Sequence, residues 1–328
     1  MAENKDVNIE ALTDLCTPWC VFVVATLRIA ENIDEGFHSI SQLAKKSGCD
    51  PYALHRVLTH LVGKGLFEEA RPGWFTLNKT SRGLLDPTSR LGFDLEGIGG
   101  RMAYAWGTLL TYVKTGAPAY QQVFGLPFWE DLEAHPEVSA SFDALIGPAG
   151  HGLPNPDFQI WGGWDSIKTV VDVGGGTGAM LAGILQLHAH VRGILVDLPM
   201  TASRAVEIFQ SFGVTERVTT VGQSFFDPLP TGADIYLLRG ILNDWPDPEA
   251  LAILKRCAEA ARPDGRVVVL KSVSSANESR GIMIEMVLLG GKHRFLSEFR
   301  LLAQEAGLEI SAAGQQPSGY FVVECHPG

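Results

Sequence analysis

The chain has 328 residues, a formal net charge of −11 at pH 7 and 46% hydrophobic residues. This length is enough for two domains, each with its own core. The acidic balance and the lack of any Lys/Arg run argue against nucleic acid and anionic membranes as partners. No apolar stretch is expected to span a membrane, and the first residues lack the basic and apolar parts of a signal peptide, so we expect a cytoplasmic protein.

The five cysteines form no CxxC pair, which is typical of a protein in a reducing compartment. Cys16 and Cys20 are four residues apart and would share one face of a helix. As metal ligands they would need partners that the neighbouring sequence does not offer. We therefore expect both to be buried thiols, and we expect no metal in the protein.

The first long segment, residues 9–30, is apolar on all sides. Such a helix does not suit a solvated surface, so we expect it to pack against a partner subunit in a homodimer. Residues 39–77 then follow a winged-helix pattern of helix, turn, helix and hairpin. The second of these helices offers only Arg56 and Lys64 as cations, too few for a phosphate backbone, so we expect a structural role and not DNA binding.

Residues 90–160 are predicted to be helical, with aromatic side chains that mostly belong to a core. Within them, the Pro- and Gly-rich residues 147–156 indicate a connection between domains. The predicted boundaries are therefore residues 1–155 for a helical, winged-helix dimerisation and substrate-lid domain, and residues 156–328 for a cofactor-binding domain.

From Trp164 onwards, predicted strands alternate with helices. The strands are expected at residues 169–173, 193–197, 218–221, 234–238, 266–270 and 320–324. This alternation predicts an α/β fold with a doubly wound, Rossmann-like sheet, which binds its ligand at the carboxyl ends of the strands.

A glycine cluster follows the first of these strands, because residues 169–173 run directly into Gly174-Gly-Gly-Thr-Gly178. Glycines allow backbone N–H groups to approach a ligand closely, and the helix that follows adds its positive N-terminal end. Asp197 ends the second strand, where an acid commonly holds ribose hydroxyls. The pattern fits either a dinucleotide or S-adenosylmethionine.

Asp172 separates these two cofactors. A carboxylate just before the glycines would repel a pyrophosphate, whereas it suits a ligand with an ammonium and a sulfonium group. The residues therefore favour S-adenosylmethionine, with S-adenosylhomocysteine as the product.

Five motifs then identify a family by their order. They are Asp172-Val-Gly-Gly-Gly-Thr-Gly, Val196-Asp-Leu-Pro199, Ser224-Phe-Phe-Asp-Pro-Leu-Pro230, Tyr236-Leu-Leu-Arg-Gly-Ile-Leu-Asn-Asp-Trp245 and Gly290-Gly-Lys-His-Arg294. Over essentially its whole length the chain resembles the S-adenosylmethionine-dependent O-methyltransferases, especially bacterial enzymes that modify aromatic natural products. The resemblance implies a class I methyltransferase domain after a winged-helix dimerisation domain, and a small aromatic substrate.

The resemblance also implies roles for individual cofactor-binding residues. Gly174 and Gly176 would lie along the methionine moiety, and Asp197 would hold the ribose. Leu198 would pack on the adenine, with Ser224 and Phe225 at the same ring, although many relatives have Asp at the position of Ser224. Arg239 would meet the carboxylate of the cofactor.

The catalytic positions depart from the family pattern. Relatives carry a His general base in Leu-His-Asp-Trp, and this position is Asn243, which cannot accept a proton. The acid that usually orients the His is replaced by Lys271, and a second acid is replaced by Met283, with Glu285 nearby. Lys271 could act as a cation that lowers the pKa of the acceptor, or as a base if burial lowers its own pKa. His151 and His293 are alternative bases in loops.

Two enzymatic functions remain open from the sequence, beside a third alternative of a catalytically inactive binding or regulatory protein. One is methyl transfer to a small aromatic metabolite by proximity, without the His base. The other is a non-methylating reaction on the same fold, such as cyclisation, hydroxylation or decarboxylation, that uses the cofactor's positive charge. Residues expected to line an apolar substrate pocket are Trp106, Phe142, Ile146, Met283 and Met286.

Overall fold

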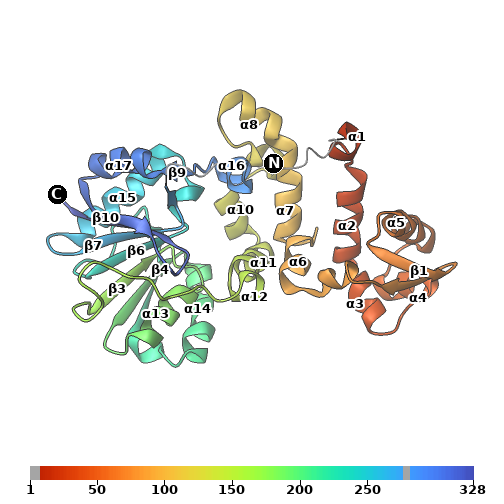
Figure 1. Ribbon diagram of the computed structural model, residues 1–328, viewed down its shortest axis with the longest axis horizontal. Coiled ribbons are helices and arrows are strands. Elements are labelled where there is room, and N and C mark those ends of the chain that lie inside the picture. Colours follow the sequence, from red (N-terminus) through yellow and green to blue (C-terminus); the bar gives the residue numbers. More distant parts are fainter. Residues whose placement is uncertain (1–7, 276–280) are drawn as a thin grey trace. The chain divides into compact units, whose positions relative to one another are not determined.

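The computed structural model describes residues 8–275 and 281–328 (Figure 1). Packing divides the chain into two compact units, residues 1–103 and 104–328. The predicted domain boundary after residue 155 lies inside the second unit. As a boundary between independently folding domains, it stays a prediction.

The first unit has a helix-turn-helix and a hairpin as predicted. Ser39 forms a capping box with Gln42 at the start of α4, and Asp50 caps α5 directly before Pro51. The antiparallel strands β1 and β2 form the wing. The elements are α1 (Ile9–Leu12), α2 (Cys16–Thr26), α3 (Ile29–Asp34), α4 (Ile40–Ser47), α5 (Pro51–Gly63), β1 (Phe67–Arg71), β2 (Trp74–Leu77), η1 (Ser81–Leu85), α6 (Pro87–Gly92) and α7 (Ile98–Ala105).

The apolar N-terminal segment corrects the prediction that no apolar stretch is long enough to span a membrane. Ile9–Thr26 has 18 residues with a hydropathy of 1.4, so by length and composition alone it reaches the size of a membrane span. The chain does not form one continuous helix there, because α1 ends at Leu12 and α2 begins at Cys16. Ile9, Leu12 and Leu15 are 69%, 69% and 75% exposed, which leaves an apolar surface on the single chain.

The second unit begins with short helices and continues into the sheet. The helical part contains η2 (Trp106–Thr108), α8 (Leu109–Thr115), α9 (Tyr120–Phe124), α10 (Phe128–Ala134), α11 (Pro136–Ile146) and α12 (Pro148–His151). The rest contains β3 (Thr169–Val173), α13 (Ala179–Leu187), β4 (Arg192–Asp197), α14 (Pro199–Ser211), η3 (Thr215–Arg217), β5 (Val218–Gly222), β6 (Ile235–Arg239), η4 (Leu242–Asp244), α15 (Asp247–Ala261), β7 (Arg266–Leu270), β8 (Val273–Ser274), α16 (Ile284–Leu289), β9 (Arg294–Phe295), α17 (Leu296–Glu305), β10 (Leu308–Gln315) and β11 (Phe321–Pro327).

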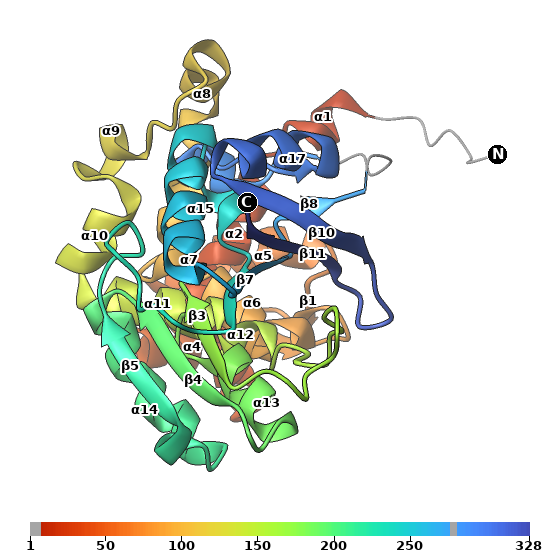
Figure 2. The ribbon, with the colours of Figure 1, turned by 90° about the vertical axis from the view of Figure 1, so that its left-hand side faces the viewer.

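The seven-stranded sheet has the order β10-β11-β7-β6-β3-β4-β5. The five strands from β7 to β5 are parallel, whereas β11 is antiparallel to both β7 and β10. Figure 2 shows α15 and α17 on one face of the sheet and α13 and α14 on the other. Leu238 belongs to the core under α15 and α17, and its neighbour Leu237 to the core under α13 and α14. Strands buried on both faces in this way explain the continuous apolar runs in the sequence.

The predicted α/β fold class is confirmed, with one strand added. β3 and β7 have the predicted bounds, and the other four predicted strands lie within a residue or a few of the observed ones. β10 was not predicted, because its sequence, Leu308-Glu-Ile-Ser-Ala-Ala-Gly-Gln315, contains few of the branched and aromatic residues that favour strands. Its side chains alternate between more and less buried positions, as expected at the edge of a sheet.

Candidate cofactor and substrate site

The glycine loop between β3 and α13 has a backbone that other residues would not adopt. Gly174, Gly176 and Gly178 have φ values of 68°, 61° and 80°. A Cβ atom at Gly174 would lie 2.6 Å from Ile241 Cδ1, whereas one at Gly176 would meet nothing within 4 Å. Gly174 is therefore fixed by its neighbours, and Gly176 borders open space that a ligand could fill.

Gly178 allows a direct test of this loop. A Cβ atom there would lie 2.4 Å from Cζ of the buried ring of Phe209. Gly178→Ala is therefore expected to lower the free energy of unfolding by about 2–3 kcal/mol through overpacking and backbone strain, measured by urea denaturation. Gly232→Ala is the matched control, because Gly232 has nearly the same φ of 82° with nothing within 4 Å of its Cβ position. Equal losses in both variants would show that the Phe209 contact contributes nothing.

Asp197 lies at the carboxyl end of β4, next to the glycine loop. Its Oδ2 accepts a hydrogen bond from Gly176 N and its Oδ1 one from Leu198 N, both at 2.8 Å. Burial raises the pKa of Asp197 to about 6, and the two backbone N–H groups oppose that rise. At neutral pH the side chain is therefore mostly ionised, which suits the hydroxyls of a ribose.

Asp172 and Arg239 carry polar atoms that the protein leaves unsatisfied. Asp172 is 1% exposed, and neither its Oδ2 nor Arg239 Nε has a hydrogen-bond partner among the described residues. Burial raises the pKa of Asp172 to about 7, although the nearby Arg239 guanidinium lowers it. Buried groups of this kind are expected to find a partner, so the pair fits a ligand that carries both an ammonium and a carboxylate.

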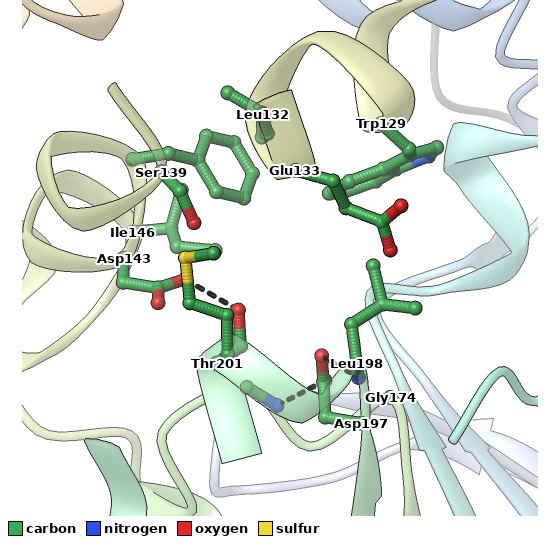
Figure 3. A pocket seen from close by; sticks show the side chains of 13 residues that line it. Trp129, Leu132, Glu133, Ser139, Asp143, Ile146, Gly174, Asp197, Leu198 and Thr201 are labelled. Atoms are coloured by element: carbon green, nitrogen blue, oxygen red, sulfur yellow. Dashed lines mark hydrogen bonds between the residues drawn. The ribbon is translucent and has the colours of Figure 1, made fainter. Parts of the chain in front are cut away.

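A pocket opens beside this loop (Figure 3) and contains about 520 Å³ of space, part of it continuous with the solvent. Across the pocket from Asp197 and Leu198 lie Trp129 and Leu132 of α10. The residues that line it are Trp129, Leu132, Glu133, Ser139, Phe142, Asp143, Ile146, Gly174, Gly176, Asp197, Leu198, Met200 and Thr201.

The pocket thus brings together six of the predicted site residues, four for the cofactor and two for the substrate. They are Gly174, Gly176, Asp197, Leu198, Phe142 and Ile146. Asp143 and Trp129 belong to the same lining and were not predicted. Asp143 forms an ion pair with Arg204 and accepts a hydrogen bond from Thr201 Oγ1 at 3.4 Å. An ion-paired Asp on a helix gives no sequence signal, because its partner lies about sixty positions away.

Asn243 is held by hydrogen bonds at both ends of its amide. Ser272 Oγ donates to Asn243 Oδ1 at 2.9 Å, and Asn243 Nδ2 donates to Asp244 Oδ1 at 2.8 Å. Burial raises the pKa of Asp244 well above its ordinary value, and the nearby Glu285 raises it further. The side chain that contacts Asn243 near the end of β7 is therefore Ser272 and not the adjacent Lys271.

Arg294 fixes the short helix η4 that carries Asn243. This Arg is 1% exposed; Nη1 donates to Leu242 O, and Nη2 donates to Trp245 O at 2.9 Å. Asp247 balances the charge, with its Oδ1 2.8 Å from Arg294 Nη2. The backbone on both sides of Asn243 is thus held by one buried cation.

Three further predicted residues, Ser224, Phe225 and Lys271, are not among the residues that line the pocket. Phe225 contacts the ring of Trp245 edge-on at 6.0 Å between centroids, and Ser224 Oγ accepts a hydrogen bond from Phe226 N at 3.2 Å. Lys271 has a positive φ of 64°, lies 6.0 Å from the ring of Tyr320, and has a pKa lowered by burial and by Arg239.

The predicted substrate residues outside the pocket lie on neighbouring elements. Met286 is on α16, which contacts both η4 and η2, and Met283 is the N-terminal cap of α16. Trp106 begins η2 and is 38% exposed. The two candidate histidines each have a partner. His151 is the last residue of α12, and a ring nitrogen of its side chain meets Leu145 O; His293 Nε2 lies 2.8 Å from Ser274 Oγ.

A glycine-rich loop, an acid at the end of the next strand and a mixed seven-stranded sheet define a class I methyltransferase-like domain. The sequence model of the O-methyltransferase domain matches residues 106–309, and that of the O-methyltransferase dimerisation domain matches residues 9–87. The chain belongs to the S-adenosylmethionine-dependent O-methyltransferases, in the branch that serves bacterial natural-product biosynthesis.

Similar proteins support this assignment over nearly the full length. A solved structure of NcsB1, an O-methyltransferase from neocarzinostatin biosynthesis in complex with S-adenosylmethionine and 2-hydroxy-5-methyl naphthoic acid, is 38% identical with a TM-score of 0.90, and covers 98% of this chain and 99% of that one. The 2,7-dihydroxy-5-methyl-1-naphthoate 7-O-methyltransferase of Streptomyces carzinostaticus is 39% identical over 94% of each chain. Aclacinomycin 10-hydroxylase RdmB of Streptomyces purpurascens is 35% identical over 97% of this chain and 87% of its own. The predicted cofactor is confirmed by this family membership, and S-adenosylhomocysteine is bound in another NcsB1 structure.

Proposed function

We propose that this enzyme methylates a hydroxyl group of a small aromatic natural product by aligning it with the donor, without a side-chain general base. The observation that carries the proposal is Asn243. It stands where the family resemblance implies a His base, and both ends of its amide are engaged by Ser272 and Asp244. A neutral amide cannot accept a proton, so Asn243 acts as a positioning residue.

The cofactor is proposed to bind through the residues that the loop and strand ends bring together. Asp197 would accept hydrogen bonds from the ribose hydroxyls, while Asp172 and Arg239 would meet the ammonium and carboxylate of the methionine moiety. Gly176 leaves the backbone open along that moiety, and Gly174 would line it beside Gly176. Leu198, with Ser224 and Phe225, would surround the adenine. Bound S-adenosylmethionine supplies an electrophilic methyl group on a sulfonium.

The substrate is proposed to lie between the pocket residues and η4. Phe142 and Ile146 would contact it from α11, and Trp106, Met283 and Met286 would cover it from η2 and α16. General-base catalysis is worth roughly a hundred- to ten-thousand-fold, whereas alignment can contribute about 7–11 kcal/mol. Alignment therefore suffices for an acceptor acidic enough to ionise without a base, and the cation of Lys271 would favour that ionised form.

The test is release of S-adenosylhomocysteine from the purified enzyme with hydroxynaphthoic acids as substrates. The proposal is supported if the amount of methylated product equals the amount of S-adenosylhomocysteine released. The second candidate is hydroxylation, which the 35% identity to aclacinomycin 10-hydroxylase favours. In assays supplied with dioxygen as oxidant and a thiol as reductant, a product that carries an added oxygen atom, without release of S-adenosylhomocysteine, would establish that reaction instead.

The enzyme is proposed to work as a homodimer through its N-terminal helices. Sedimentation velocity at micromolar concentration should then give about twice the chain mass of 35.5 kDa. Leu12→Glu with Leu15→Glu places two charges on the exposed apolar surface and is expected to shift the protein toward monomers or aggregates. Leu187→Glu, on a leucine 54% exposed in the second unit, is the matched control. A wild-type monomer would contradict the prediction.

A further inference from the structure

A group of metal-binding side chains lies in the first unit, far along the sequence from the pocket residues. Cys16 and Cys20 are one turn apart on α2, and His60 comes from α5. Their two sulfur atoms and a ring nitrogen of His60 all lie within 4.8 Å of one another. Cys16 is exposed and Cys20 partly buried in the single chain, so the prediction of buried thiols is wrong for this pair. The third candidate ligand, His60, lies outside the neighbouring sequence, which was expected to offer no partner, and folding brings it to the two cysteines.

The spacing of the sulfur atoms matches a tetrahedral metal site. Zinc binds thiolates at about 2.3 Å, which puts two sulfur ligands roughly 3.8 Å apart at the tetrahedral angle. Cys16 Sγ and Cys20 Sγ are 3.8 Å apart. Helices α2 and α5 pack against each other, and Val24 of α2 and Leu58 of α5 lie in the same core, so the ligand positions are held by the fold.

The hydrogen bond between His60 and Thr17 indicates which ring nitrogen of His60 carries the proton. Thr17 Oγ1 donates to Asp14 Oδ2 at 2.6 Å, so it must accept from His60 Nε2, which is 2.8 Å away. With its proton on Nε2, the imidazole carries its lone pair on Nδ1. Metal-binding histidines characteristically donate their other ring N–H in this way. Lys64 Nζ, 2.7 Å from Asp14 Oδ2, balances the charge of the carboxylate.

We propose that Cys16, Cys20 and His60 bind a zinc ion, with water as the fourth ligand. Two thiols lose their protons to solvent, and two zinc–sulfur bonds and one zinc–nitrogen bond form. The thiolate charges neutralise the ion, and thiolate and imidazole are the donors that zinc prefers. The ion would link α2 to α5 within the dimerisation domain and takes no part in methyl transfer.

The experiment uses the full-length protein, reduced and treated with a chelator, then titrated with Co(II) and with Zn(II). The wild type should show thiolate-to-cobalt charge-transfer absorption that saturates at one ion per chain and disappears when zinc is added. Zinc should also raise the Tm. The proposal would be overturned if the reduced wild type showed no charge-transfer absorption. It would also be overturned if Cys16 and Cys20 formed a disulfide in the untreated protein and bound no metal once that disulfide was reduced.

Substitutions assign the ligands. Cys16→Ser and His60→Ala should each weaken zinc binding by more than about a hundredfold, since even second-shell changes cost ten- to a hundredfold. Cys16 is exposed in the single chain and serine is close to it in size, so the replacement is expected to leave the fold of the first unit intact. Cys49→Ser is the matched control, because Cys49 is a partly buried thiol outside the cluster. Unchanged binding in Cys16→Ser would overturn the proposal.

Discussion

Asp197→Ala is expected to weaken binding of S-adenosylmethionine by about a hundredfold, or about 2.7 kcal/mol. The reason is the loss of a carboxylate that would accept charge-assisted hydrogen bonds from the ribose hydroxyls, and that also holds Gly176 N in the glycine loop at 2.8 Å. Isothermal titration calorimetry of the wild type and the variant measures the change. Asp264→Ala is the matched control, because Asp264 is exposed in the turn before β7.

The same side chain gives a pH dependence with a defined sign. The pKa of Asp197 is raised to about 6, and the ionised form is the better acceptor. Cofactor affinity should therefore rise as the pH increases through about 6. The Asp197→Ala variant should lose this part of the rise, whereas the part due to Asp172, whose pKa is raised to about 7, should remain. A wild-type affinity that is the same at pH 5 and pH 8, or unchanged binding in Asp197→Ala, would contradict the assigned role.

Asn243→Ala is expected to lower kcat by about ten- to a hundredfold, as for a lost positioning hydrogen bond in the transition state. Asn243→His should not raise the native activity, because the surrounding hydrogen bonds to Ser272 and Asp244 are arranged for an amide. Kinetics across pH 5 to 9 distinguish the roles, and Asn155→Ala, on an exposed loop residue, is the control. If Asn243→His were much faster and gained a pH limb near about 6.5, the enzyme would be a base-dependent methyltransferase with a decayed site.

The cofactor half of the site could be predicted from the sequence because its residues are close together along the chain. Val170, Val171 and Val173 specify a buried strand, the glycines specify the turn, and Asp197 ends the next strand. Parallel strands place such ends at one edge of the sheet, so the geometry follows from local patterns.

The part of the site around Asn243 and Asp143, where the substrate is proposed to bind, could not be predicted in the same way, because its contacts join distant segments. Ser272 meets Asn243 across two strand ends, and Asp143 pairs with Arg204 of α14. The sequence resemblance points to the adjacent Lys271 at the end of β7. The positive φ of Lys271 turns the chain at that residue, and Ser272 donates to the amide of Asn243 instead. In the first unit, the proximity of His60 to Cys16 and Cys20 could not be predicted for the same reason, since no local pattern connects the three residues.

The position of β11 in the sheet has a consequence for biosynthesis on the ribosome. β11 follows every other strand in chain order, yet it lies between β10 and β7. Until β11 emerges, β7 is an uncovered edge, and such edges invite pairing with other chains. The segment before β3 depends on the same late strand, because Trp161 N donates to Glu324 Oε1 at 2.7 Å. Without β11 in place, β7 should therefore be a site at which the chain pairs with other chains and aggregates.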